Sequence, residues 1–160
     1  MYVDGLSFLE DEREAWLPFE ALASLPDADF VRPVEAAHGW SARDLAVHLI
    51  SGQAHALEVA RELAVSDHSA AWERGEREWE EKGGDVFNAE VQAAAAGLTD
   101  AQVRARLTDV PGELRGYLTV VPETRWVKNA TFREFFLSET LDHYGDHAAD
   151  LSAILAAAGR

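Results

Sequence analysis

The chain has 160 residues, of which 48% are hydrophobic, so it is long enough for one domain with a real core and too short for two comfortable ones. A net charge of -15 and the lack of a Lys/Arg stripe argue against nucleic acid and anionic membranes as partners. Cysteine is absent, which excludes disulfides, thiolate metal ligands and a cysteine nucleophile. Any thiol chemistry would therefore need a thiol supplied by a small molecule.

The same composition bears on location. The chain has no apolar run of about 18 residues, so no transmembrane helix is expected. Residues 1–5 lack the basic and apolar segments of a secretory signal. We therefore expect a cytoplasmic protein that folds as a single domain over residues 1–160.

Two helices are predicted in the first part of the chain. The first, over residues 7–25, opens with a Ser-x-x-Glu capping box and contains Pro18, which should kink or divide it. Residues 30–39 form a connection. The second helix, over residues 41–65, opens with a weaker Ser-x-x-Asp box, and Trp40 just before it is expected to act as a packing staple.

Three further segments precede the C-terminal helix. Residues 66–84 are polar and acidic, and we expect a helical piece within this long connection. Residues 85–97 are typical of a short helix. A Thr-x-x-Gln box starts a helix over residues 99–118, with a bend expected at Pro111, and residues 119–130 form a loop.

The closing helix is predicted over residues 131–157, from a Thr-x-x-Glu box to the stop signal Gly159. Its inward stripe is apolar at both ends and polar in the middle. Buried polar groups are costly unless they are satisfied, and a metal ion would satisfy them. The polar positions of this stripe are Glu139, Thr140, His143, His147 and Asp150.

Strand-like alternation with hairpin turns is absent from the sequence. The predicted fold is therefore all-α, an antiparallel bundle of four main helices with short extra helices in the connections.

Three histidines are the candidate metal ligands. His143 and His147 are four residues apart, so on one helix they lie about 40° apart and one turn from each other. His48 falls on the inward stripe of another helix and is the best third ligand. Neutral imidazole binds Zn, Ni, Fe and Cu, and three protein ligands leave a coordination position free, as in catalytic sites.

Two carboxylates flank the pair on the closing helix. Glu139 and Asp150 lie close to His143 on the same stripe and are the candidate catalytic residues. They could orient the imidazoles or act as a base on a bound water, and Glu139 could instead be a fourth ligand.

Other interpretations of the histidines stay open. Exposed histidine pairs with this spacing are common on helices that bind no metal. His55 lies two turns after His48 and is a rival ligand or a pocket residue. His38 and His68 fall in connections and are expected to be solvated. Gly52, one turn after His48, either opens space beside that histidine or serves close helix packing.

Two motifs resemble those of the DinB/YfiT-like superfamily. Residues 39–49, GWSARDLAVHL, are similar to its Gly-Trp-Ser/Thr-x-x-Asp-Leu-x-x-His-Leu segment, and residues 143–147 match its His-x-x-x-His. The resemblance extends from about residue 9 to residue 155. It implies a four-helix bundle, a three-histidine site for a divalent metal and, frequently, a homodimer.

Two branches of that superfamily are the most similar. One comprises thiol-dependent S-transferases and isomerases, including the maleylpyruvate isomerase N-terminal type. Its metal activates mycothiol or bacillithiol, which suits a chain without cysteine. The other is the colibactin self-resistance (ClbS/DfsB-like) branch, resembled by residues 85–91 and 142–147. It implies hydrolysis of a reactive electrophile or protection against one.

The sequence thus predicts an enzyme that holds Zn or Ni at His48, His143 and His147 and activates a thiol or water against a small-molecule electrophile. The alternative is a non-catalytic bundle that binds metal or a small molecule, or acts as a stress-linked interaction module.

Overall fold

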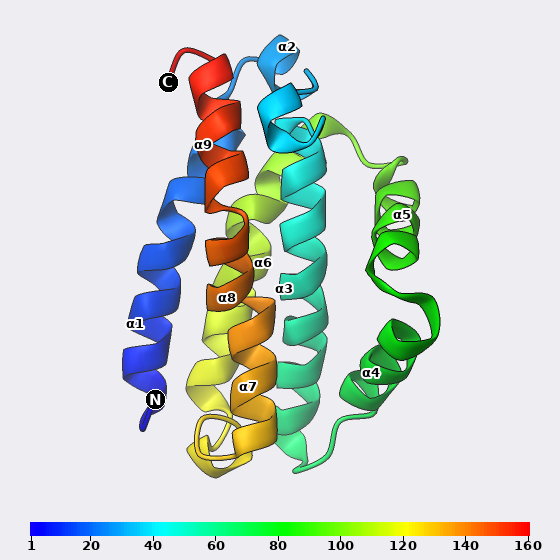
Figure 1. The fold of residues 1–160 in the computed structure, drawn as a ribbon. Helices are drawn as coiled ribbons and strands as arrows, with labels where there is room; N and C mark the ends of the chain where they lie inside the picture. The colour runs from blue at the N-terminus through cyan, green and yellow to red at the C-terminus, as the bar shows by residue number, and fades with distance from the viewer.

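The computed structural model describes residues 1–160 and is all-α, so the predicted helical bundle is confirmed. Figure 1 shows α1, α3, α6 and the succession α7–α9 running alongside one another, with α4 and α5 standing on the outer side of α3. No helix combines the length and the apolar character needed to cross a membrane. The elements are α1 (Gly5–Trp16), η1 (Leu17–Ser24), α2 (Asp27–Phe30), η2 (Glu35–Ala37), α3 (Ala42–Val65), α4 (Ala70–Lys82), α5 (Gly84–Ala95), α6 (Asp100–Val120), η3 (Glu123–Arg125), α7 (Ala130–Glu139), α8 (Leu141–Asp146) and α9 (Ala148–Ala157).

The core consists of two clusters of buried apolar side chains along α3. In one cluster Leu45 of α3 is buried with Trp16 and Tyr144. In the other, Val59 of the same helix is buried with Phe136. Because α3 contributes to both clusters, it is the central element against which the remaining helices pack.

Two of the predicted capping boxes are confirmed. At the start of α3, the side chains of Ser41 and Asp44 each accept a hydrogen bond from the other residue's backbone N–H. The side chains of Thr99 and Gln102 do the same at the start of α6. These boxes satisfy backbone donors that a helix start leaves free. The first box fixes where α3 begins, and its Ser41 lies seven residues before the inward His48.

The other two predicted boxes are wrong. Asp4 caps α1 by accepting a hydrogen bond from the backbone N–H of Ser7, over 2.8 Å. Asn129 likewise caps α7 by accepting one from Phe132, over 3.3 Å. Ser7 and Thr131 therefore lie inside their helices, because a better N-cap side chain stands just upstream of each.

Two prolines affect their helices differently. Pro18 acts as predicted, because α1 ends at Trp16 and a 3-10 segment follows. The bend expected at Pro111 does not end α6, which continues through it. A proline leaves the carbonyl four residues earlier without its helical partner. Here that carbonyl belongs to Leu107, and it accepts a hydrogen bond from Nε1 of Trp16 over 2.8 Å.

The closing helix is interrupted twice, which corrects the prediction of one continuous helix. Thr140 leaves the helical region with φ -126° and ψ -98°, and His147 has φ -104° and ψ 8°. The hydroxyl of Thr140 donates to the carbonyl oxygen of Phe136, a local bond that bends helices. The stop predicted at Gly159 is confirmed, since α9 ends just before it and its φ is +73°.

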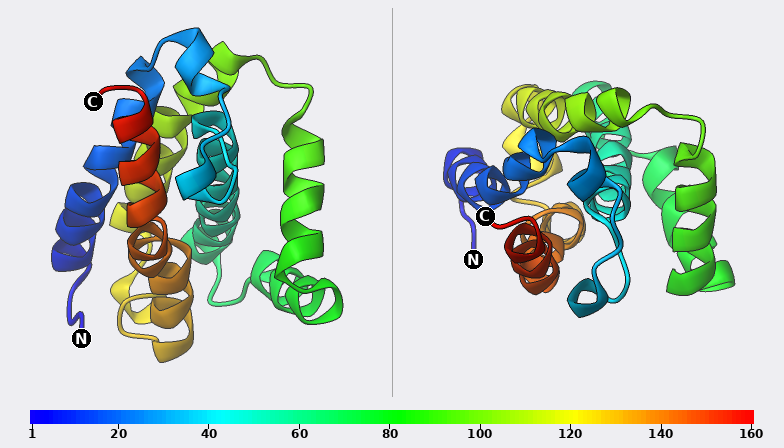
Figure 2. Two further views of the ribbon diagram at one scale, coloured as in Figure 1. Left: turned by 45° about the horizontal axis from the view of Figure 1, so that its top comes forward. Right: turned by 90° about the horizontal axis from the view of Figure 1, so that it is seen from above.

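The helices α4 and α5 form an arm beside α3, seen from above in Figure 2. The two helices are separated at Gly83, whose φ of +75° is a backbone conformation that glycine adopts without steric cost. Ala71 is the one buried residue of α4, and α5 buries none. The arm is thus held by half-buried packing and by specific polar contacts, one of which reaches the site.

Candidate metal centre

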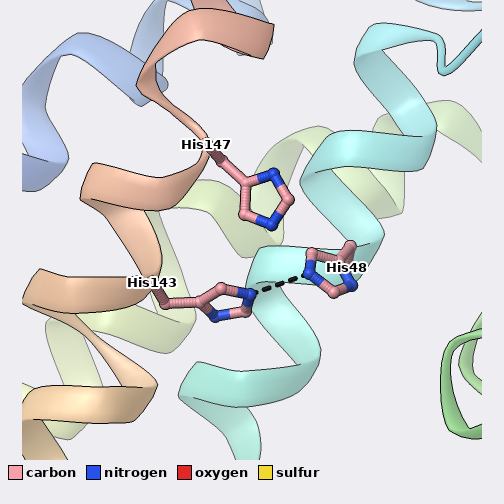
Figure 3. A group of neighbouring side chains, drawn as sticks. All are labelled: His48, His143 and His147. Atoms are coloured by element: carbon pink, nitrogen blue, oxygen red, sulfur yellow. Dashed lines mark hydrogen bonds between the residues drawn. The ribbon is translucent and has the colours of Figure 1, made fainter. Parts of the chain in front are cut away.

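The three predicted ligands converge at one point. His48 projects from α3, His143 from α8, and His147 from the junction between α8 and α9 (Figure 3). One ring nitrogen from each lies within 4.8 Å of the other two. The Nε2 atoms of His48 and His143 are 2.7 Å apart. Imidazoles from two separate parts of the chain therefore meet, as the sequence predicted.

The histidine pair keeps its spacing despite the helix break. The backbone N–H of His147 lies 3.3 Å from the carbonyl oxygen of His143, the ordinary helical bond over four residues. The break comes only at His147 itself. Both rings consequently face α3 as they would on a regular helix.

An amide from the arm sets the tautomer of His48. Its Nδ1 lies 2.9 Å from Oδ1 of Asn88 in α5. An amide oxygen only accepts hydrogen bonds, so Nδ1 carries the proton and Nε2 presents its lone pair to the centre. Sequence reasoning missed Asn88. The sequence feature that could have indicated it is its position on the same helical face as the apolar Val91 and Ala95.

A carboxylate orients His147 in the same way. Oδ2 of Asp150 lies 2.8 Å from Nδ1 of His147, and Asp150 is only 6% exposed. A carboxylate on Nδ1 fixes the ring and makes the opposite nitrogen a better ligand. His38, expected to be solvated, is exposed but has its Nε2 only 3.6 Å from Oδ1 of the same carboxylate. Of the two roles considered for Asp150, this geometry matches orientation of an imidazole.

Two of the imidazoles, those of His48 and His143, are kept neutral. Burial, followed by the neighbouring His48 and His147, lowers the pKa of His143 to about 3. Burial also lowers the pKa of His48, against the opposing effect of its hydrogen bond to Asn88. Neutral imidazole is the form that binds metal ions, so at neutral pH no proton has to leave these two rings first.

Glu139 borders the centre from the end of α7. Burial, and then the like charge of Glu76, raise its pKa to about 7. A Cβ added to Gly52 would lie 2.8 Å from Oε2 of Glu139 and 3.2 Å from Nδ1 of His143. Gly52 therefore leaves room for these two groups, where the sequence suggested space beside His48 or close helix packing.

Trp40 forms an aromatic wall of the site. Its ring stacks on His147, with 5.7 Å between centroids and 18° between planes, and meets His48 edge-on at 5.0 Å. The sequence predicted only a packing staple at this position. The indole also packs against the apolar core, so the two roles coincide.

Two other histidines lie away from the centre. His55, the rival ligand, meets Phe135 edge-on at 5.3 Å, and its ring fills the space over Gly75 in α4. It is not part of the converging group. His68 is exposed, as expected, with its Nε2 3.5 Å from Glu73.

A buried polar chain holds α8 in place. The hydroxyl of Tyr144 donates to Oε1 of Glu12 over 2.8 Å and accepts from Nε2 of Gln53 over 2.8 Å. Arg115 donates to the other oxygen of Glu12 over 2.8 Å. Because α8 is only six residues long with a break at each end, these contacts fix the rotation that turns His143 toward α3.

The donor set fits a divalent transition metal. Three imidazole nitrogens converge, two of them are held by protein groups on Nδ1, and no thiolate takes part. Imidazole suits Zn and Ni, and a three-ligand site keeps a position open for a further molecule.

Comparison with known proteins gives one family. The family described as mycothiol maleylpyruvate isomerase N-terminal domain matches residues 10–151. It is a DinB/YfiT-like family, so the resemblance drawn from the two histidine motifs is confirmed. No curated protein and no solved structure matches significantly.

Proposed function

The chain belongs to the mycothiol maleylpyruvate isomerase N-terminal domain family, and we propose that it is a metal-dependent enzyme acting on a small electrophile. In this proposal His48, His143 and His147 hold one Zn or Ni ion. A thiol or a water attacks the electrophile, which makes the protein a thiol S-transferase or a detoxifying hydrolase.

One observation carries the proposal: three imidazoles from two parts of the fold converge, with one ring nitrogen of each within 4.8 Å of the others. Bringing three half-buried polar rings together costs free energy unless a bound group compensates for their lost hydration. The hydrogen bonds of Asn88 and Asp150 supply a second argument, because both occupy Nδ1, so Nε2 is the ring nitrogen that remains for an ion.

The chemistry divides between the ion and the protein. A divalent ion held there would act as a Lewis acid and lower the pKa of a thiol or water that it binds. Glu139, with a pKa of about 7, accepts a proton from the nucleophile near neutral pH. Asp150 keeps His147 in its ligand tautomer, and Trp40 shields the rings on one side.

The thiol in this proposal is a small molecule. The chain has no cysteine, so it carries no thiol nucleophile of its own. The family's description names mycothiol, and bacillithiol is the other low-molecular-weight thiol expected from the resemblance. We also propose that the protein acts in the cytoplasm as a homodimer.

Turnover of monochlorobimane, a generic thiol-reactive electrophile, tests the reaction. Metal-loaded protein, chelator-treated protein and the His143→Ala variant are each assayed with mycothiol, with bacillithiol and with no thiol. A thiol-dependent rate that needs both the metal and His143 supports S-transfer.

A panel of hydrolysable electrophiles, assayed without thiol, covers the second reaction. Product formed only by the metal-loaded wild type supports hydrolysis. If every rate equals that of the chelator-treated protein, the enzyme proposal is wrong and a binding bundle is the better account. The His68→Ala variant is the matched control, because that histidine is exposed and remote from the centre.

A further inference from the structure

An apolar groove lies between α3, α5 and α6, apart from the three histidines. Its volume is about 280 Å³, and eight of its ten lining residues are hydrophobic. Val47, Ile50 and Val103 are buried and form its floor. The nearest link to the metal centre is Ser51, which lines the groove and whose hydroxyl donates to the backbone carbonyl of His48 over 2.7 Å.

Polar bonds hold the groove open. Arg43 of α3 donates to the carbonyl oxygens of Ala95 and Leu98, over 3.0 and 2.8 Å. Gln92 of α5 donates to the carbonyl oxygen of Asp44, over 3.0 Å. These bonds fix how far α5 stands from α3. None of the α5 side chains is fully buried, although Val91 and Ala95 pack against the core.

Small side chains leave the space between the helices unfilled. Ala54 of α3 and Ala94 and Ala95 of α5 face the groove. The groove is therefore a consequence of the small residues that α3 and α5 place on its two walls.

One cation stands at the rim. Arg106 of α6 is exposed and makes no ion pair, although the chain carries 29 acidic residues. No carboxylate lines the groove. The only other polar lining residue is Ser51, and its hydroxyl proton is already donated to a backbone oxygen. An occupant thus meets an apolar floor and a single guanidinium, which favours an apolar body with one anionic group.

We propose that this groove binds a small amphipathic anion, with its apolar body on Val47, Ile50 and Val103 and its carboxylate or sulfonate group at Arg106. The volume lies just below the usual range for ligand pockets, roughly 300–1,000 Å³, so it suits one small molecule. The site is independent of the metal and of the proposed reaction.

Two fluorescent probes that differ mainly in charge test the site on the full chain. Anilinonaphthalene sulfonate has an apolar body and one anionic group, and phenylnaphthylamine has the same body without the charge. Both are titrated against wild type, Arg106→Ala, and Arg77→Ala as the matched control. Arg77 is also an exposed arginine without an ion pair, on α4.

The expected result is one sulfonate bound per chain, with affinity about threefold to fivefold lower in Arg106→Ala, the effect of one exposed charge pair. The uncharged probe should bind wild type and Arg106→Ala equally, and Arg77→Ala should match wild type with both probes. Ala94→Trp, which fills the groove from its exposed rim, should weaken both probes. His143→Ala should leave both unchanged.

Other outcomes overturn the proposal. Equal sulfonate affinity in Arg106→Ala and wild type would show that Arg106 does not bind the anionic group, which contradicts the proposal. Binding that survives Ala94→Trp places the probe elsewhere. No saturable binding of the sulfonate to folded wild type removes the site.

Discussion

The amide oxygen of Asn88 lies 2.9 Å from Nδ1 of His48 and joins the α4–α5 arm to the three-histidine cluster. This is the contact through which an otherwise loosely packed helix reaches the proposed ligands. It also decides which nitrogen of His48 carries the proton.

Asn88→Ala should weaken metal binding without unfolding the bundle. Loss of a group that is hydrogen-bonded to the far nitrogen of a metal-binding imidazole typically lowers metal affinity by about 10–100-fold. Competition for Zn with a chromophoric chelator measures the change. Gln92→Ala is the control, because it loosens the same helix by removing its bond to Asp44. An equal loss in both variants would assign the effect to the arm's position.

Tyr144→Phe should destabilise the metal-free protein by about 1–3 kcal/mol. The substitution leaves Oε1 of Glu12 and Nε2 of Gln53, both on buried side chains, without the partner that the hydroxyl provides. Urea unfolding in the presence of a chelator measures the free energy. Tyr117→Phe removes the same atom from a side chain that is 36% exposed, and it should change stability by less than about 0.5 kcal/mol.

Metal affinity of the Tyr144→Phe variant provides a second reading. If the buried chain sets the rotation of α8, the variant binds Zn more weakly at temperatures where it is fully folded. Unchanged affinity would show that His143 finds its position without Tyr144.

Gly52→Ala should disturb the site from behind. Its added methyl carbon would lie 2.8 Å from Oε2 of Glu139 and 3.2 Å from Nδ1 of His143, so at least one of these groups has to move. We expect weaker metal binding, measured by isothermal titration. Gly116→Ala on α6 meets nothing within 4 Å and should stabilise the protein by about 0.5–1 kcal/mol. Wild-type affinity in Gly52→Ala would mean that neither group matters to the ion.

Glu139→Gln should change how stability depends on pH in the metal-free protein. The pKa of Glu139 is about 7 when folded and near 4.5 when unfolded, so the folded state holds the extra proton between these values. Its contribution is therefore present below pH 4.5 and is lost as the pH rises through 7. The variant should exceed wild type in stability at pH 8 and approach it at pH 4.

The matched control for that measurement is Glu134→Gln, an exposed glutamate on the same helix. It should follow wild type at both pH values in chemical denaturation. A Glu139→Gln variant that gains no stability at pH 8 would contradict a buried carboxylate that resists ionisation.

The histidine triad could be predicted from sequence because its geometry is local. His143 and His147 depend only on one helical turn, which survives in α8. His48 lies on the apolar stripe of α3, whose start is fixed by a capping box. Periodicity and caps are short-range signals, so they identified these three positions.

The groups around the triad depend on contacts between distant segments. Asn88 reaches His48 across 40 residues, and no short-range pattern encodes that approach. The break at Thr140 arises from a side-chain bond to Phe136 that competes with the helix. The uninterrupted α6 likewise requires Trp16, from a remote helix, to satisfy the carbonyl left free by Pro111.

Metal content per chain tests the central claim most directly. Wild type, the three single alanine variants of His48, His143 and His147, and the His68→Ala control are loaded with Zn or Ni, desalted and analysed for bound metal. The account predicts one ion per chain in wild type and His68→Ala, and little or none in the other three. Equal metal content in all five proteins would contradict it.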